Sequence, residues 1–149
     1  LIGMNVDDLD ELVSEFIESH KEKLIDPMTF DLLKRHKDDF RLVASGSLDF
    51  IVKGFTNYFE LDAYLGSSYE VVDNKISGKL TKAAFAQGKL EKVREWCQKN
   101  GYIVEESFFY TDSINDLPLI KVCPRSIIIS PDKKLEDYAL ANNIEVLTR

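Results

Sequence analysis

Residues 108–120 have the sequence FFYTDSINDLPLI, in which an apolar aromatic run stops at Thr111 and a polar turn follows. The turn carries two carboxylates, Asp112 and Asp116, and the amide of Asn115, before a new apolar segment begins. This pattern predicts a buried strand that ends in acidic side chains. Open α/β folds place their ligand sites at the carboxyl ends of such strands.

The polar turn has two interpretations. Two carboxylates and an amide at a strand end are hard oxygen ligands, and they predict a magnesium site with room for waters and a phosphate. Asp and Asn are also ordinary helix caps, so the same residues are compatible with a strand followed by a capped helix. The turn alone does not decide between the two, and the rest of the chain has to.

The composition is that of an ordinary globular protein. The 149 residues suffice for one domain with a core, and the hydrophobic content is 44%. A net charge of −7 argues against a nucleic-acid partner, because no basic patch offsets the acidic residues. A phosphate-handling enzyme is compatible with this charge, because its site charge is local.

Cys97 and Cys123 have no metal-ligand spacing, which predicts buried thiols in a reducing compartment. The sequence shows neither an apolar run of membrane-spanning length nor a signal peptide, so we expect a cytoplasmic protein without a membrane partner. The chain begins at Leu1, and its first methionine is Met4. We therefore expect a fragment, a trimmed polypeptide or the ordered part of a longer protein.

Two helices are predicted at the start of the chain. Asn5 precedes an acidic first turn and apolar residues at helical spacing, which predicts a helix from about Val6 to about Lys21. Asp26 followed by Pro27 predicts the start of a second helix. Both helices stand outside the strand–helix alternation that follows, so we expect a separate helical element.

Strands and helices alternate from residue 40 onward. Phe40–Ala44 is a predicted strand, Ser45–Ser47 a predicted turn and Leu48–Phe59 a predicted helix, which together make one βα unit. Tyr64-Leu65 predicts a further short strand, and the segments flanking Asp73-Asn74 predict a small β-hairpin. Residues 79–87 favour no one element.

The second half continues the alternation. Lys89–Asn100 has one apolar face and Gly101 just past its end, which predicts a helix. The later elements are a strand, a helix and a strand, at Ser126–Ile129, Lys133–Asn142 and Glu145–Leu147. The alternation predicts an α/β, Rossmann-like fold, with a parallel sheet that carries helices on both faces.

Ser45 and Lys89 are further candidates for handling a phosphate. The Ser45 hydroxyl and the amides at the next helix start would form a phosphate cradle, although Ser45 is equally compatible with a helix cap. Lys89 opposes the dipole at the start of its helix, which favours either a cation held for a nearby anion or a solvated lysine. Lys92, one turn on, is the competing candidate.

Taken together, these segments resemble the haloacid dehalogenase superfamily of phosphatases, in particular the phosphoserine-phosphatase-like branch. DSINDLPL at residues 112–119 is similar to the fourth motif, and LVASGSLDF at residues 42–50 is similar to the second. The resemblance assigns the phosphate-binding hydroxyl to Ser45. It assigns the third-motif lysine to Lys89, which lies 23 residues before Asp112, rather than to Lys92.

The resemblance divides the chain into residues 1–38, the C-terminal part of a helical cap, and residues 39–149, a core without its first strand. The family's first motif supplies the aspartate nucleophile, and this sequence has no such motif. The acids at residues 7, 8 and 10 lie in an amphipathic helix and cannot replace it. We therefore expect an open slot in the sheet that leads the chain to self-associate or to accept an upstream segment or a partner strand.

The resemblance also implies roles for the candidate residues. Asp112 would hold Mg²⁺, and the catalytic residues would be Lys89, Asp112 and Asp116. The groups that bind substrate would be Ser45, Gly46, Lys89 and Asn115. The implied substrate is a small phosphorylated metabolite.

The leading hypothesis is the C-terminal portion of a magnesium-dependent phosphomonoester hydrolase that is inactive without its nucleophile. The alternative is a non-catalytic or truncated relative that acts in binding or regulation. A third interpretation is an unrelated doubly wound domain, although the sequence has no glycine-rich nucleotide motif.

Overall fold

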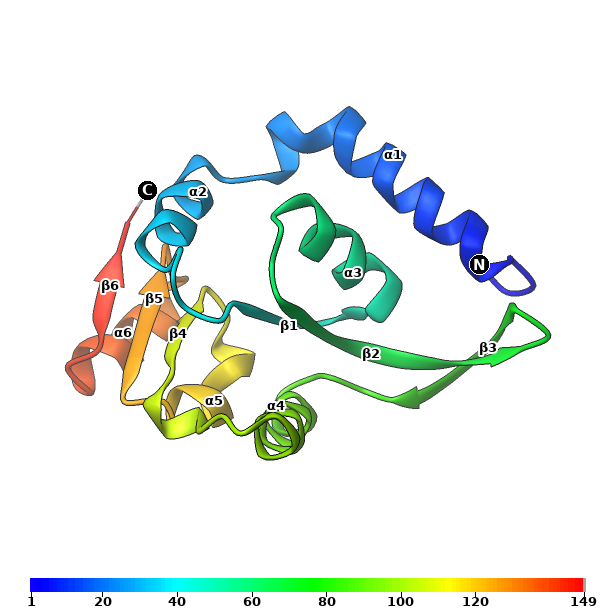
Figure 1. The fold of residues 1–149 in the computed structure, drawn as a ribbon. Helices are drawn as coiled ribbons and strands as arrows, with labels where there is room; N and C mark the ends of the chain where they lie inside the picture. The colour runs from blue at the N-terminus through cyan, green and yellow to red at the C-terminus, as the bar shows by residue number, and fades with distance from the viewer. Residues whose placement is uncertain (149) are drawn as a thin grey trace. The chain divides into compact units, whose positions relative to one another are not determined.

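The computed structural model describes residues 1–148, which form two compact units (Figure 1). The first unit is Leu1–Ala84, and the second begins at Phe85. Each unit contains one three-stranded sheet, with the strand orders β1-β2-β3 and β4-β5-β6. The α/β class is confirmed. The boundary at residue 84 differs from the one expected at residue 38, and the assignment of residues 1–38 to a cap stays a prediction.

The first unit opens with the two predicted helices, α1 (Val6–Leu24) and α2 (Pro27–Arg35). The Asn5 side chain accepts a hydrogen bond from the Asp7 amide at the start of α1, and the Asp26 side chain caps α2 in the same way. These caps satisfy amide groups that have no partner inside a helix, so both helices begin where the sequence predicts.

The strand β1 (Leu42–Leu48) leads directly into α3 (Asp49–Tyr58). The prediction of a turn at Ser45–Ser47 is wrong, because these residues lie inside β1. The pairing register between β1 and β2 shifts between Ala44 and Leu48, so three residues of β1 lie opposite the single residue Gly66. Serine and glycine are small residues, and they suit such a bulge as well as they suit a turn.

The remaining strands of the first unit are β2 (Ala63–Val72) and β3 (Lys75–Lys82). β2 pairs in parallel with β1 and antiparallel with β3. The predicted hairpin turn is present, with positive φ angles of 49° at Asp73 and 60° at Asn74. A turn of this type favours Asn and Gly, which explains why the local sequence was informative.

The core of the first unit lies between α1, α3 and the hairpin. Its buried side chains are Leu9, Val13, Ile17, Phe50 and Ile76. A Cβ atom at Gly54 of α3 would lie 2.3 Å from Val13 Cγ1 of α1, so the two helices approach at a glycine. The first helix is therefore packed into this unit.

The second unit begins with α4 (Gln87–Asn100), which ends at Gly101 in the left-handed conformation, as predicted. Its strands are all parallel and pair in the order in which they occur in the chain. The elements after α4 are η1 (Val104–Glu106), β4 (Phe108–Thr111), η2 (Ile114–Asp116), α5 (Leu117–Ile120), β5 (Arg125–Ile129), α6 (Lys133–Ala141) and β6 (Glu145–Leu147). The core side chains Ile120, Ile128, Leu135 and Ala139 join α5 and α6 to the sheet.

Within residues 1–148, none of the helices combines the length and the apolar character that crossing a bilayer requires.

Candidate functional site

The turn after β4 is held together by short-range hydrogen bonds. The Ser113 amide donates to Thr111 Oγ1 at 3.1 Å, and the Asp116 amide donates to the Ser113 carbonyl at 3.1 Å. The Asn115 amide donates to Ser113 Oγ at 3.3 Å. The turn that the sequence predicts therefore folds back on the last residue of the strand, and this brings the side chain of Asp116 beside Thr111.

Asp116 forms a buried ion pair with Lys89. Lys89 Nζ lies 2.5 Å from Asp116 Oδ1, and Thr111 Oγ1 donates to Asp116 Oδ2 at 2.7 Å. The three residues are between 6% and 9% exposed. Burying two charges costs several kcal/mol of folding free energy unless their hydrogen-bonding groups are satisfied. The hydrogen bond from Thr111 to the second oxygen of Asp116 therefore helps to offset the cost of burying this pair.

Lys89 is the third residue of α4, and this helix begins directly after Ala86, which has a positive φ of 47°. The sequence left open whether Lys89 is a solvated lysine or a cation held beside an anion. Lys89 is buried and its anion is Asp116, so a solvated lysine is excluded. Lys92 is also buried, but the carboxylate at the strand end pairs with Lys89.

Asp112 and Asn115 have exposed side chains in the same turn. The two acids of this motif therefore differ in environment, because Asp116 is buried and paired while Asp112 faces solvent. An exposed carboxylate can bind a ligand from solution without first breaking an internal ion pair. The separate roles that the resemblance implies for the two acids stay predictions.

Ser45 and Gly46 belong to the first unit, where they lie in the bulge of β1. Ser45 Oγ accepts a hydrogen bond from the Ser47 amide at 3.2 Å. The interpretation of Ser45 as a helix cap is wrong, because the N-cap of α3 is Leu48 and no side chain caps that helix. The bulge leaves Gly46 exposed and Ser45 half-buried.

Two positioning residues were not predicted from the sequence. Ser67 of β2 is buried, donates to the Gly46 carbonyl at 2.8 Å and accepts from the Ala84 amide at 2.9 Å. Thr111 donates to Asp116 as described above. The sequence did contain a signal for Thr111, because a hydroxyl at the last position of an aromatic strand indicates a polar role. The signal for Ser67, a serine inside a mainly apolar strand, was weaker.

The two thiols are buried, as predicted. Burial raises the pKa of Cys123 to about 11, with a smaller contribution from the negative charge of Glu105. Burial also raises the pKa of Cys97. Both thiols are therefore protonated near neutral pH, and neither has the character of a nucleophile or a metal ligand.

Within residues 1–148, no three His, Cys, Asp or Glu side chains cluster in a way that could hold a metal ion. Magnesium, however, is usually held by one or two carboxylates, several waters and a substrate phosphate. The exposed carboxylate of Asp112 fits one of those ligands. Asp116 is already shared between Lys89 and Thr111, so the described residues fit an ion held by a single protein carboxylate.

Comparison with known proteins places these features in a family. The model of the haloacid dehalogenase-like hydrolase family matches residues 1–121. The chain belongs to this family. The family that these segments together resemble is therefore confirmed, and the haloacid dehalogenase-like match covers β1, α4 and the turn after β4.

Relatives of this haloacid dehalogenase-like chain include proteins named phosphatases. It is 28% identical to a histidinol-phosphatase of Neisseria meningitidis over 144 residues, which cover 92% of this chain and 63% of that protein. A Bordetella pertussis protein of unknown function has the same fold, with a TM-score of 0.88, 23% identity and coverage of 97% of this chain and 67% of that one. A phosphoserine phosphatase solved with an analogue of its phospho-aspartyl intermediate superposes with a TM-score of 0.61, at 18% identity, over 98% of this chain and 66% of that one.

The haloacid dehalogenase-like chain spans about half to two thirds of the length of the curated relatives that it matches.

Proposed function

We propose that this chain supplies phosphate- and metal-binding residues to a magnesium-dependent phosphomonoester hydrolase. The aspartate nucleophile would come from outside residues 1–149. The observation that carries the proposal is the buried Lys89–Asp116 pair beside the exposed carboxylate of Asp112 at the end of β4. Phosphoryl transfer depends mainly on positioning and on stabilising charge, and this arrangement provides both.

Lys89 and Asp116 act together in this proposal. The Lys89 ammonium group has three N–H donors, and the contact with Asp116 uses one of them. Asp116 holds the ammonium group in place, and Thr111 holds the carboxylate from its other oxygen. Lys89 is then a fixed donor for the negative charge of a phosphoryl group, at no cost of reorganisation during the reaction.

Asp112 is the proposed ligand of Mg²⁺, for which it offers a solvent-facing carboxylate. The ion would neutralise charge on the transferring phosphoryl group. Ser45, Gly46 and Asn115 are the proposed substrate-binding residues. In the first unit, Ser67 fixes the backbone at Gly46 and so supports the shape of the bulge.

The named phosphatases among the relatives support a small phosphorylated metabolite as the substrate class. The solved phosphoserine phosphatase carries an analogue of a phospho-aspartyl intermediate, which supports an aspartate nucleophile in the complete enzyme. The proposal also includes the cytoplasmic location that the sequence predicts.

The second candidate is a non-catalytic relative that binds a phosphate or a metal ion. The observation that favours it concerns the acids near the N-terminus. Asp7 and Asp8 lie in the first turn of α1, and Asp10 pairs with Lys53 of α3, so none stands at the end of a strand. This placement favours the interpretation that none of the three is the nucleophile.

Mn²⁺, a paramagnetic substitute for Mg²⁺, tests the metal assignment on the chain itself. We expect Mn²⁺ to broaden the amide resonances of residues 111–116 and Asp112→Asn to abolish this effect. The matched control is Asp137→Asn, which changes an exposed acid on α6. Broadening that survives in Asp112→Asn would show that the metal assignment is wrong.

Activity separates the two candidate functions. In a polypeptide that includes the first motif, we expect Asp112→Asn to lower magnesium-dependent hydrolysis of 4-nitrophenyl phosphate about 10²- to 10³-fold, as loss of one transition-state stabiliser does. Mn²⁺ binding at Asp112 without hydrolysis by that polypeptide would favour the non-catalytic relative.

A further inference from the structure

The first unit contains a pocket of about 270 Å³ beside α2, the C-terminal end of α3 and the start of β1. Its apolar wall consists of Leu33 and the aromatic side chains of Phe30, Tyr58 and Phe59. The Phe30 and Phe59 rings are tilted with centroids 5.6 Å apart, and the Tyr58 and Phe59 rings are perpendicular at 5.0 Å. Such edge and face contacts make a rigid wall against which another aromatic ring can pack.

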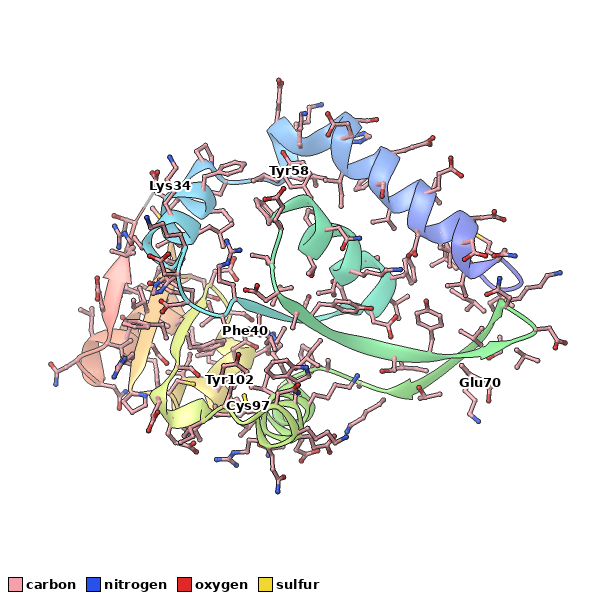
Figure 2. The ribbon with its side chains drawn as sticks, in the orientation of Figure 1. Lys34, Phe40, Tyr58, Glu70, Cys97 and Tyr102 are labelled. Atoms are coloured by element: carbon pink, nitrogen blue, oxygen red, sulfur yellow. The ribbon has the colours of Figure 1, made fainter. Side chains whose placement is uncertain are left out.

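Three cationic side chains line the same pocket, in a chain whose net charge is −7. Lys34 and Lys37 come from α2 and the segment after it, and Arg41 precedes β1. Figure 2 labels Lys34 and Tyr58, on α2 and α3 respectively. Lys34 forms a 3.9 Å ion pair with exposed Asp31, which is weak competition for a ligand.

Arg41 is fixed rather than mobile. Its amide donates to Asp62 Oδ2 at 2.7 Å, and its Nη2 donates to the Glu60 carbonyl at 2.8 Å. Its Nε is buried without a hydrogen-bond partner and lies 3.6 Å from the Asp62 carboxylate. The guanidinium charge is therefore held beside the pocket, while the two lysines supply donors that can turn toward a ligand.

Glu60 lowers the net positive charge of the pocket, and this limits the charge of the anion that the pocket can neutralise. It also lines the pocket, and it follows Phe59, the C-cap of α3, in the left-handed conformation at φ 52°, where glycine or asparagine is more common. Three cations and one carboxylate leave a local excess of about two positive charges at neutral pH. This excess is partly offset by Asp62 and suits a singly charged carboxylate better than a phosphate dianion.

The pocket is separate from the bulge that carries Ser45 and Gly46, which is the part of the proposed phosphate site in the first unit. Arg41 precedes β1, and Ser45 lies four residues further along the strand, which corresponds to about 13 Å at 3.3 Å per residue. Neither Ser45 nor Gly46 lines the pocket.

We propose that this pocket binds a small aromatic carboxylate. The ring packs on Phe30, Tyr58 and Phe59, and the carboxylate accepts hydrogen bonds from Lys34 and Lys37 in the positive field of Arg41. The volume is near the lower limit for ligand pockets, about 300 Å³, which restricts the ligand to one or two rings.

Titration with 2-naphthoate, followed by amide NMR of the ¹⁵N-labelled chain, tests the proposal. We expect saturable shifts at residues 30–41 and 58–60, and binding at least fivefold weaker for the neutral analogue 2-naphthalenemethanol. Lys37→Ala should weaken binding about two- to fivefold, the usual range for one exposed charge pair. Lys23→Ala, at an exposed lysine of α1, is the matched control and should bind as the parent does.

Glu60→Gln keeps the shape of the side chain and removes its charge, so it should strengthen 2-naphthoate binding. Misfolding cannot strengthen binding, so this variant tests the proposal even if Lys37→Ala fails to fold. Asp112→Asn should bind 2-naphthoate as the parent does, which separates this site from the proposed phosphatase function. Shifts that do not saturate, equal binding of the neutral alcohol or an unchanged affinity in Lys37→Ala would each overturn the proposal.

Discussion

The two units hold their candidate site residues by different forces. In the second unit, the carboxylate of Asp116 and the ammonium group of Lys89 are buried against each other. In the first unit, the bulge that carries Ser45 is held by neutral hydrogen bonds, chiefly from the hydroxyl of Ser67. One candidate site depends on buried charge, and the other depends on the shape of the backbone.

The difference matters because the two forces fail differently. A buried charge that loses its partner stays buried and unpaired, so removing one member of the pair costs far more than the pair contributes. A neutral hydrogen bond contributes about 0.5–1.5 kcal/mol, and its loss is tolerated more easily. The second unit should therefore be the more sensitive of the two to substitution at its candidate site.

The largest effect is expected for Asp116→Ala. It leaves the Lys89 ammonium group buried without a counter-charge, which typically lowers the free energy of unfolding by about 3–5 kcal/mol. Native-state hydrogen exchange of the β5 amides measures the free energy of unfolding of the second unit. Exchange of the β2 amides measures it for the first unit, which should not change.

Two controls separate the ion pair from general damage. Glu136→Ala removes an exposed ion pair with Lys133 on α6 and should cost at most about 1 kcal/mol. The double variant Asp116→Ala/Lys89→Met removes both charges and should recover part of the lost stability. If Asp116→Ala costs no more than Glu136→Ala, the pair is not buried in solution.

A smaller effect in the second unit is expected for Thr111→Val, which has nearly the same shape but lacks the hydroxyl. Asp116 Oδ2 loses its donor and the Ser113 amide loses its acceptor, so we expect a loss of about 1.5–3 kcal/mol, as for hydrogen bonds to charged groups. The matched control is Thr56→Val in α3. Its buried hydroxyl donates to the Val52 carbonyl, a neutral partner. Equal losses in the two variants would contradict the distinction between charged and neutral partners.

Local chemistry made most of the fold predictable. Asp26-Pro27 starts a helix and Asp73-Asn74 turns a hairpin because each pair has a conformational preference that needs no distant partner. The turn predicted at Ser45–Ser47 was wrong for the same reason. Serine and glycine favour a turn and a bulge alike, and the choice is made by β2, which pairs on both sides of the bulge.

The candidate site was less predictable than the fold. The motif spacing brought Lys89 and Asp116 into one hypothesis, but it did not predict that they pair with each other. That contact requires Lys89 of α4 to reach the turn after β4, which no local pattern specifies. The partner of Gly46 was missed because Ser67 lies 21 residues away in the sequence. Sequence patterns identified the groups that carry the chemistry, and tertiary contacts determined what holds them.

The smallest effect is expected for Ser67→Ala in the first unit. The substitution removes the donor to the Gly46 carbonyl and the acceptor of the Ala84 amide, both neutral groups, so we expect a loss of about 1 kcal/mol. Exchange of the β2 amides measures it, and Ser77→Ala, whose exposed hydroxyl accepts from the Lys79 amide at 3.3 Å, is the control. A loss as large as that of Asp116→Ala would mean that the bulge depends on Ser67 as strongly as the turn after β4 depends on its ion pair. The contrast between charge and backbone shape would then fail, because a single hydroxyl would hold one site as firmly as a buried ion pair holds the other.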